Sequence, residues 1–218
     1  MGNKIDFEQL HDLITQKQYR AVRNALVELN VIDIATFLEE LDDKETVIVF
    51  RILPKELLAD IFPYISPDAQ QHIIEGITEK ELSFIIEELY IDDAVDMLEE
   101  LPANVVKRVL RNASKETRAQ INQFLRYPED SAGSIMTAEF VDLKKKMTVK
   151  EAIDHIRLEG AESETIYTCY VINNRRILEG VVTVKELLLS SDEMLVEDIM
   201  DTQIIKAATT DDQEEVSH

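Results

Sequence analysis

The sequence predicts a mainly α protein that continues into α/β structure. We expect a superhelix of short helices up to about residue 130, then a compact module and the start of a second copy of it. Apolar residues recur every twelve positions in the first half, which is typical of stacked short helices. Residues 127–137, which contain Pro128, Gly133, two serines and an acidic pair, interrupt this pattern. The spacing then indicates strand, helix, strand, strand, helix.

The twelve-residue repeat forms three rows that are apolar except at the last position of the third row. The first row is Leu29, Leu41, Leu53, Ile65, Ile77, Leu89, Leu101, Ala113 and Leu125. The second is Ala25, Phe37, Val49, Ile61, Ile73, Ile85, Met97, Val109 and Ile121. The third is Leu26, Leu38, Phe50, Phe62, Ile74, Ile86, Leu98, Leu110 and Asn122. Because offsets of three and four lie on one helix face, each unit predicts a helix that buries this face only against its neighbours.

Helix-start signals lie between the apolar stripes. Thr78 and Glu81 have the capping-box spacing, in which each side chain satisfies an amide at the helix start. Asp42 and Glu45 repeat that spacing, and Ser66 precedes a proline, as a helix cap often does. We therefore expect each unit to be a short helix followed by a tight turn.

The charge of the chain limits its partners. Its 218 residues carry 44 acidic and 23 basic side chains, a formal charge of −21. This charge argues against nucleic acid, whose phosphates need basic contacts, and against an anionic membrane surface. Cations and basic proteins are compatible partners, although an acidic surface can also serve solubility alone.

Other features bear on the cellular compartment and on catalysis. Cys169 is the single cysteine, so no intrachain disulfide is expected. We find no signal peptide in the polar residues 1–6 and no apolar run of membrane-spanning length, so we expect a soluble, cytosolic chain. A glycine-rich phosphate loop and a Ser–His–Asp arrangement are both missing from the sequence, and we do not expect an enzyme.

The second half begins a repeat of its own. We expect strands at 140–143, 165–172 and 177–183, and helices at 149–157 and 184–189, the first capped by Thr148 with Glu151. The start of this unit then recurs at a constant offset. The matching pairs are Ile135-Met136 with Ile199-Met200, Phe140-Val141 with Ile204-Ile205, and Glu151-Ala152 with Glu215-Val216. The sequence ends at His218, inside the first helix of the copy, and we expect a fragment of a longer protein.

Acidic residues gather in one stretch of the helical half. The cluster consists of Glu87, Glu88, Asp92, Asp93, Asp96, Glu99 and Glu100. Asp92 and Asp96 are four apart and share a helix face, where like charges repel, and acids at helix ends such as Glu87 oppose the helix dipole. A solvated face is the commoner explanation. A bound cation would relieve the repulsion, and oxygen ligands without a calcium-loop motif favour magnesium.

Three motifs carry a resemblance to a known family. They are Tyr127-Pro128-Glu129-Asp130-Ser131-Ala132-Gly133 with Ile135-Met136-Thr137, then Glu164-Thr165-Ile166-Tyr167, then Asp212-Gln213-Glu214-Glu215-Val216. The second half resembles a CBS domain, and the whole sequence resembles the cytosolic part of MgtE-type magnesium transporters. The resemblance implies an MgtE N-type helical domain at 1–130, a first CBS module at 131–197 and an incomplete second module at 198–218.

The resemblance also implies a function. Such proteins are homodimeric transporters or channels at the cell membrane, with five transmembrane helices that this sequence lacks, and magnesium bound between the cytosolic domains favours the closed pore. Matched residue by residue, the implied metal ligands are Asp92 and Asp96 in the helical domain and Asp212 and Glu214 in the second module.

ATP is a second ligand that the resemblance implies. CBS modules that bind adenosine nucleotides often carry Gly, two apolar residues, Ser or Thr, two variable residues and Asp. Here Gly180 and Thr183 match, but Glu186 replaces the Asp, which departs from the ribose-binding pattern. Two alternatives to magnesium sensing follow: an adenosine-nucleotide-binding CBS module with Thr183 as its candidate residue, and a solenoid adaptor for a basic protein.

Overall fold

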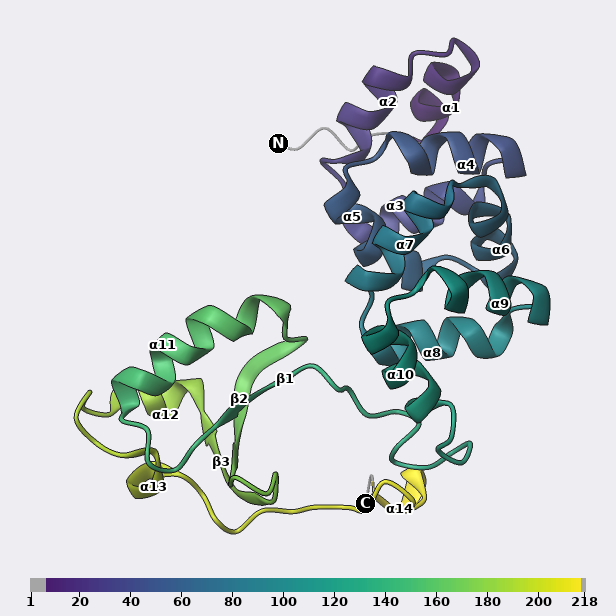
Figure 1. Cartoon of the computed structure of the whole chain (residues 1–218). Helices are drawn as coiled ribbons and strands as arrows, with labels where there is room; N and C mark the ends of the chain where they lie inside the picture. The colour runs from purple at the N-terminus through teal and green to yellow at the C-terminus, as the bar shows by residue number, and fades with distance from the viewer. Residues whose placement is uncertain (1–6, 217–218) are drawn as a thin grey trace. The chain divides into compact units, whose positions relative to one another are not determined.

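The computed structural model describes residues 7–216, with the side chain of Glu162 left aside (Figure 1). The expectations for residues 1–6 and for the last two residues of the second copy lie outside this range. The chain forms two compact units. One contains the described residues up to Leu89 together with Asp93–Gln123, and the other contains Tyr90–Asp92 together with the described residues from Phe124 onward.

The helical region follows the twelve-residue repeat. From α1 to α10, each α-helix begins twelve residues after the previous one. The helices are α1 (Phe7–Thr15), α2 (Tyr19–Leu26), α3 (Val31–Glu39), α4 (Asp43–Ile52), α5 (Lys55–Ile61), α6 (Pro67–Gly76), α7 (Glu79–Glu88), α8 (Ile91–Glu100), α9 (Ala103–Asn112) and α10 (Lys115–Phe124), with a 3₁₀ turn η1 (Phe62–Tyr64) after α5. The predicted superhelix of short helices is confirmed.

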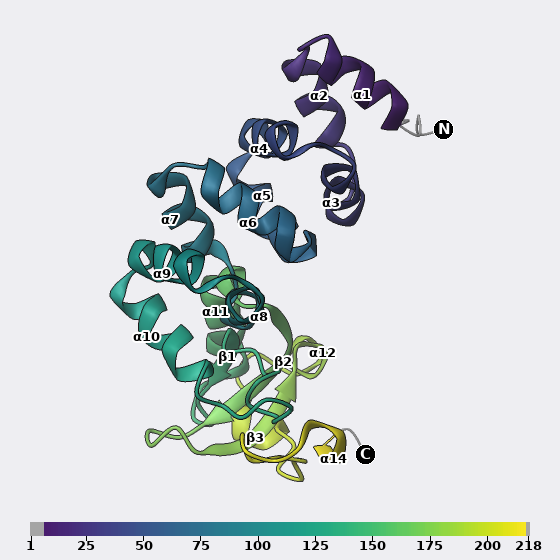
Figure 2. The same ribbon diagram turned by 90° about the vertical axis from the view of Figure 1, so that its right-hand side faces the viewer.

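Several helices pack on the helix two places further along, and α1 packs on its neighbour α2. The packed pairs include α2 with α4, α4 with α6, α3 with α5, α5 with α7, and α7 with α9, as the stacked coils of Figures 1 and 2 show. The second apolar row is buried from Phe37 to Ile121, whereas Leu125, at the end of the first row, is 37% exposed. The expected caps form as well: Thr78 and Glu81 make a complete capping box, and Asp42 accepts from the Lys44 and Glu45 amides.

Two acids at helix ends cap helices further along the chain. Glu39, the last residue of α3, accepts hydrogen bonds from the amide of Ser66 (2.6 Å) and from its hydroxyl (2.9 Å) at the start of α6. Glu87, in the last turn of α7, accepts from the Ser114 amide (2.7 Å) and the Thr117 hydroxyl (2.8 Å) at the start of α10. The position of Glu87 at the end of α7 predicts that it opposes the dipole of its own helix. The structure shows that its carboxylate also satisfies the amide end of another helix, where negative charge is favourable.

The second unit is built on a three-stranded sheet in the order β1-β2-β3. Strand β1 (Phe140–Leu143) runs parallel to β2 (Thr165–Ile172), which is antiparallel to β3 (Leu178–Thr183). Helices α11 (Val149–Glu159) and α12 (Val184–Leu189) contribute to one buried cluster with the strands. Its members are Val141, Leu143, Val149, Ala152, Ile156, Cys169, Val171, Val182, Leu187 and Val196.

The remaining elements of this unit lie at its edges. A 3₁₀ turn η2 (Gly160–Glu162) follows α11, and the short helices α13 (Val196–Ile199) and α14 (Gln213–Val216) belong to the recurring segment. Asp201 pairs with Val181 on the outer edge of β3 through two backbone hydrogen bonds of 2.8 and 2.9 Å. The second copy therefore begins as an extension of the first module's sheet.

Candidate metal and nucleotide sites

The first candidate pair lies on α8. Asp92 is in the first turn of this helix and is half-buried, while Asp96, one turn later, is exposed. Ala94 and Val95, between them, are buried and anchor the opposite face of the helix. The spacing of four places both carboxylates on the same side of α8, as the sequence predicted.

The residues around the second candidate pair form a backbone clasp, which we define as residues 130–133 together with residues 208–213. The Ala132 amide donates to the Asp211 carbonyl (2.7 Å), and the Gly133 amide donates to the Thr209 carbonyl (2.9 Å). Gln213 donates to Asp130 twice, from its amide to the Asp130 carbonyl (2.9 Å) and from its side chain to the Asp130 carboxylate (2.8 Å). The connector is therefore hydrogen-bonded to the start of the second module, a pairing of distant segments that we did not predict.

Two backbone features shape the clasp. A β-carbon on Gly133 would lie 2.7 Å from both the Thr209 carbonyl oxygen and the Tyr127 ring, so only glycine fits without a shift. Asp130 has φ of 61°, a left-handed conformation that Asp tolerates better than most residues. Together they allow the two chain segments to approach closely enough for main-chain pairing.

Asp212 and Glu214 extend from this clasp. Asp212 pairs with Ser131 in an isolated bridge, and its carboxylate accepts the Glu214 amide at 2.8 Å. Both acidic side chains are exposed. The Ser131 side chain is 3% exposed, and its hydroxyl oxygen has no hydrogen-bond partner among the described residues. Exposed carboxylates suit a hard cation that keeps several of its waters, as magnesium does.

The four predicted ligands do not form a preorganised metal site among the described residues. Within residues 7–216, no three His, Cys, Asp or Glu side chains lie close enough together to hold an ion. Asp96 belongs to the helical unit, and Asp92, Asp212 and Glu214 belong to the other. The assignment of Asp92, Asp96, Asp212 and Glu214 as ligands stays a prediction.

The nucleotide candidate Thr183 is engaged in a capping box. Its hydroxyl donates to the Glu186 carboxylate (2.7 Å) and accepts from the Glu186 amide (3.2 Å), while its own amide donates to the same carboxylate (2.8 Å). The Thr183 amide, followed by its hydroxyl, holds the pKa of Glu186 below its usual value. The carboxylate that replaces the expected Asp is therefore used to start α12.

Known proteins give a consistent match to both units. Residues 29–130 match the model of the MgtE intracellular N domain. A crystal structure of the cytosolic domain of the Mg²⁺ channel MgtE in complex with ATP is 30% identical, with a TM-score of 0.90 over 97% of this chain and 87% of that one. The chain belongs to the MgtE family.

Further relatives within the MgtE family support this assignment. The magnesium transporter MgtE of Thermus thermophilus is 32% identical over 212 residues, which are 95% of this chain and 47% of that protein. A crystal structure of the soluble part of a magnesium transporter has a TM-score of 0.87 at 29% identity, over 97% of this chain and 83% of that chain. The expected resemblance is thus confirmed, and the chain spans about half the length of the full MgtE proteins it matches. No described helix has the length and apolarity needed to cross a bilayer.

Proposed function

We propose that this chain is the magnesium-sensing cytosolic region of a transporter or channel, and that Mg²⁺ held by carboxylates of both units favours the closed pore. The observation that carries the proposal is the pair of acidic sites: Asp92 with Asp96 on α8, and Asp212 with Glu214 beside the clasp. Membership of the MgtE family supports it.

The physical mechanism is a change in the balance between repulsion and ion binding. With a formal charge of −21, the two units repel each other at low magnesium. An ion held by carboxylates from both units offsets that repulsion. Magnesium can shift such an equilibrium only as far as it binds the associated state more tightly than the separated one.

Small-angle scattering tests this mechanism on the 218-residue chain. We expect the radius of gyration to fall as Mg²⁺ is added, and to fall less when NaCl is added at the same ionic strength. Simple screening acts equally for both salts, because it depends on ionic strength alone. Identical responses to the two salts would refute the proposal.

Two double variants separate specific ligands from loss of charge. Asp92→Asn with Asp96→Asn is expected to weaken the magnesium response. Asp192→Asn with Glu193→Gln removes the same charge from an exposed loop and is expected to leave the response intact. Equal weakening in both variants would remove Asp92 and Asp96 as ligands.

The same proposal extends to the whole protein, which we place in the cell membrane with this region on its cytosolic face. It would act as a homodimer whose own transmembrane domain forms the pore. Analytical ultracentrifugation with and without Mg²⁺ measures whether this region contributes to dimer formation. A monomer at all concentrations would assign dimerisation to segments outside this sequence.

ATP is a second candidate ligand, because a relative at 30% identity has been solved in complex with it. We expect saturable ATP binding by calorimetry, weakened by Thr183→Ala. Thr148→Ala is a matched control, because Thr148 forms the same capping box with Glu151 at the start of α11. Equal losses in the two variants would indicate general destabilisation and not contact with the nucleotide.

A further inference from the structure

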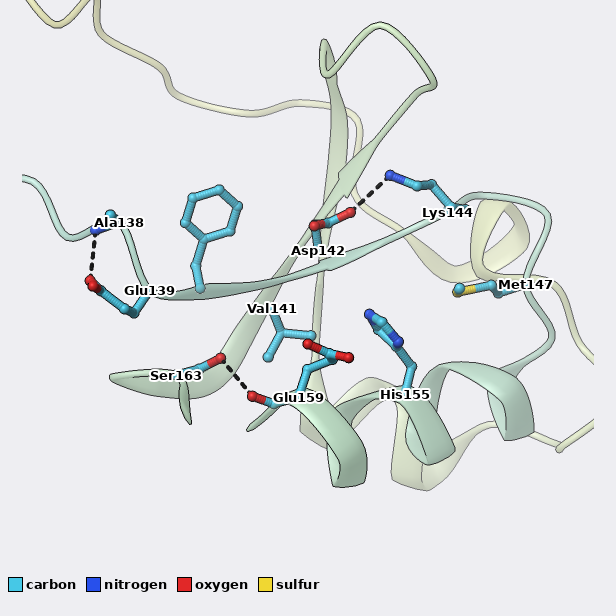
Figure 3. Close-up of a pocket in the computed structure, with 10 residues that line it drawn as sticks. Ala138, Glu139, Val141, Asp142, Lys144, Met147, His155, Glu159 and Ser163 are labelled. Atoms are coloured by element: carbon cyan, nitrogen blue, oxygen red, sulfur yellow. Dashed lines mark hydrogen bonds and ion pairs between the residues drawn. The ribbon is translucent and has the colours of Figure 1, made fainter. Parts of the chain in front are cut away.

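A cavity of about 390 Å³ opens between β1 and α11 in the second unit, which contains the sheet and which we call the CBS unit. Figure 3 shows strand β1 crossing above it, with α11 below. Val141 and Met147 give it apolar walls, and Ser163 lines it beside the end of α11. It belongs entirely to the first module, and none of the predicted magnesium or nucleotide residues lines it.

Two side chains of α11 reach this cavity from the same helix face. His155 and Glu159 are one turn apart and both line it, and Figure 3 shows both rising from α11 toward β1. Among the described residues, neither side chain has a hydrogen-bond or ion-pair partner. His155 is half-buried and Glu159 is exposed, so the pair combines a shielded imidazole with a carboxylate that solvent can reach.

The other polar groups that line the cavity already have partners. The Asp142 carboxylate accepts from Lys144 at 2.8 Å, and the Ser163 hydroxyl donates to the Glu159 carbonyl at 3.2 Å. The Glu139 carboxylate accepts from the Ala138 amide at 3.2 Å. His155 and Glu159 therefore remain as the available ligands.

The remaining described histidines differ from His155. His11 lies 3.3 Å from the Glu40 carboxylate, and His72 lies 3.3 Å from Asp43, both in the helical unit. Each of these imidazoles already has an acidic neighbour, whereas His155 faces open space beside a carboxylate placed one turn further along its helix.

We propose that His155 and Glu159 bind a divalent transition metal of the zinc class, with water completing the coordination. Imidazole nitrogen suits zinc, cobalt and nickel, whereas magnesium prefers oxygen ligands. A site with two protein ligands keeps positions open for water, unlike a closed four-ligand structural site. The cavity has room for those waters. This site would give the CBS module a response to metals other than magnesium.

Calorimetric titration of the full 218-residue chain with ZnCl₂, in saturating Mg²⁺, is the test. We expect one saturable site in the unmodified chain, at least about tenfold weaker in His155→Ala and weakened in Glu159→Gln. His72→Ala is the matched control and is expected to bind as the unmodified chain does. Circular dichroism of each variant shows whether its fold is retained.

Cobalt provides a second readout that does not depend on the stability of the alanine variant. Co²⁺ added to the unmodified chain should give visible absorption bands that zinc abolishes and that the conservative variant His155→Gln lacks. Absence of saturable zinc binding, or binding that His72→Ala abolishes and His155→Ala does not, would overturn the proposal. Asp92→Asn with Asp96→Asn should leave zinc binding unchanged, which separates this site from magnesium sensing.

Discussion

The two units differ in how far apart in the sequence their contacting segments lie. In the helical unit, the helix starts repeat every twelve residues, and several helices pack on the helix two places further along. In the CBS unit, β1 pairs with a strand more than twenty residues away, and the clasp joins segments about eighty residues apart. The structure of the first unit therefore depends on repeated local contacts, whereas that of the second depends on a few long-range ones.

Removing a large core side chain should have the largest effect. Phe50 is fully buried in α4 and packs edge-on against Phe62, with ring centroids 5.8 Å apart. Phe50→Ala should cost about 3–5 kcal/mol of unfolding free energy, because it deletes this contact and leaves a cavity. Denaturant titration followed by far-ultraviolet circular dichroism measures the loss. Tyr64→Ala, at a position 57% exposed, is the control, and an equal loss there would contradict the packing described.

The clasp should be the most sensitive point of the second unit. Gly133→Ala places a methyl group against the Thr209 carbonyl and the Tyr127 ring, and it should cost about 1–3 kcal/mol or open the clasp. Hydrogen exchange at the Ala132 amide reports on this directly, because that amide bonds to Asp211. Unchanged protection would show that the backbone adjusts without releasing the pairing.

The caps that join distant helices of the first unit should have a smaller effect. Glu87→Gln keeps the shape of the side chain but removes the charge that faces the start of α10. We expect a loss of about 1 kcal/mol, the usual size of a capping contribution. Glu88→Gln is the natural control, because its exposed side chain lies in the same turn. Equal losses from both changes would mean that the cap at Ser114 and Thr117 contributes nothing specific.

The capping box of α12 should make the CBS unit sensitive to acid. Because the pKa of Glu186 is lowered in the folded state, the box stabilises the fold above the ordinary value of about 4.5. That contribution is lost as the pH falls through the lower folded-state pKa. Thr183→Ala should cost about 1 kcal/mol at neutral pH and less in strong acid. Melting temperatures from pH 7 to pH 3 measure the difference, and a constant difference would refute this account.

The smallest expected effect tests whether the two units open independently. Burial raises the pKa of Cys169 to about 11, and the thiol is fully buried in the CBS core. Because the thiolate is the reactive form, labelling at pH 8 should require opening of that core. Phe50→Ala should leave the labelling rate unchanged. Faster labelling in this variant would show that stability is shared between the units.

Much of the fold could be predicted because the signals were local. The apolar rows predicted the helices from α2 to α10, and the spacing of Thr148 and Glu151 located the start of α11. The clasp could not be predicted, because no pattern links Asp130 to Gln213. The caps made by Glu39 and Glu87 had a detectable signal in the sequence. Each acid lies twenty-seven residues before the serine whose amide donates a hydrogen bond to it.

The candidate site was less predictable than the fold. Spacing along α8 establishes that Asp92 and Asp96 share a helix face, but it does not establish which other oxygen atoms approach an ion. A motif predicted Thr183 as a nucleotide-binding residue, and the structure shows its amide and hydroxyl in a helix cap. A short motif can thus describe both a fold requirement and a binding site, and only geometry separates the two uses.

The regular spacing of the helix starts has a consequence for how this chain can change length. Since helices from α2 to α9 pack in pairs two places apart, such as α2 with α4 and α7 with α9, the unit of growth is a pair of helices, or about twenty-four residues. Removing or duplicating a whole pair would keep the alternation of the helices, and it would preserve the sequence distance between a capping acid and its serine wherever the change lies outside their span. A shorter insertion in one turn would change the spacing of any cap whose acid and serine lie on either side of it. Evolution and engineering should therefore lengthen this superhelix in pairs of helices.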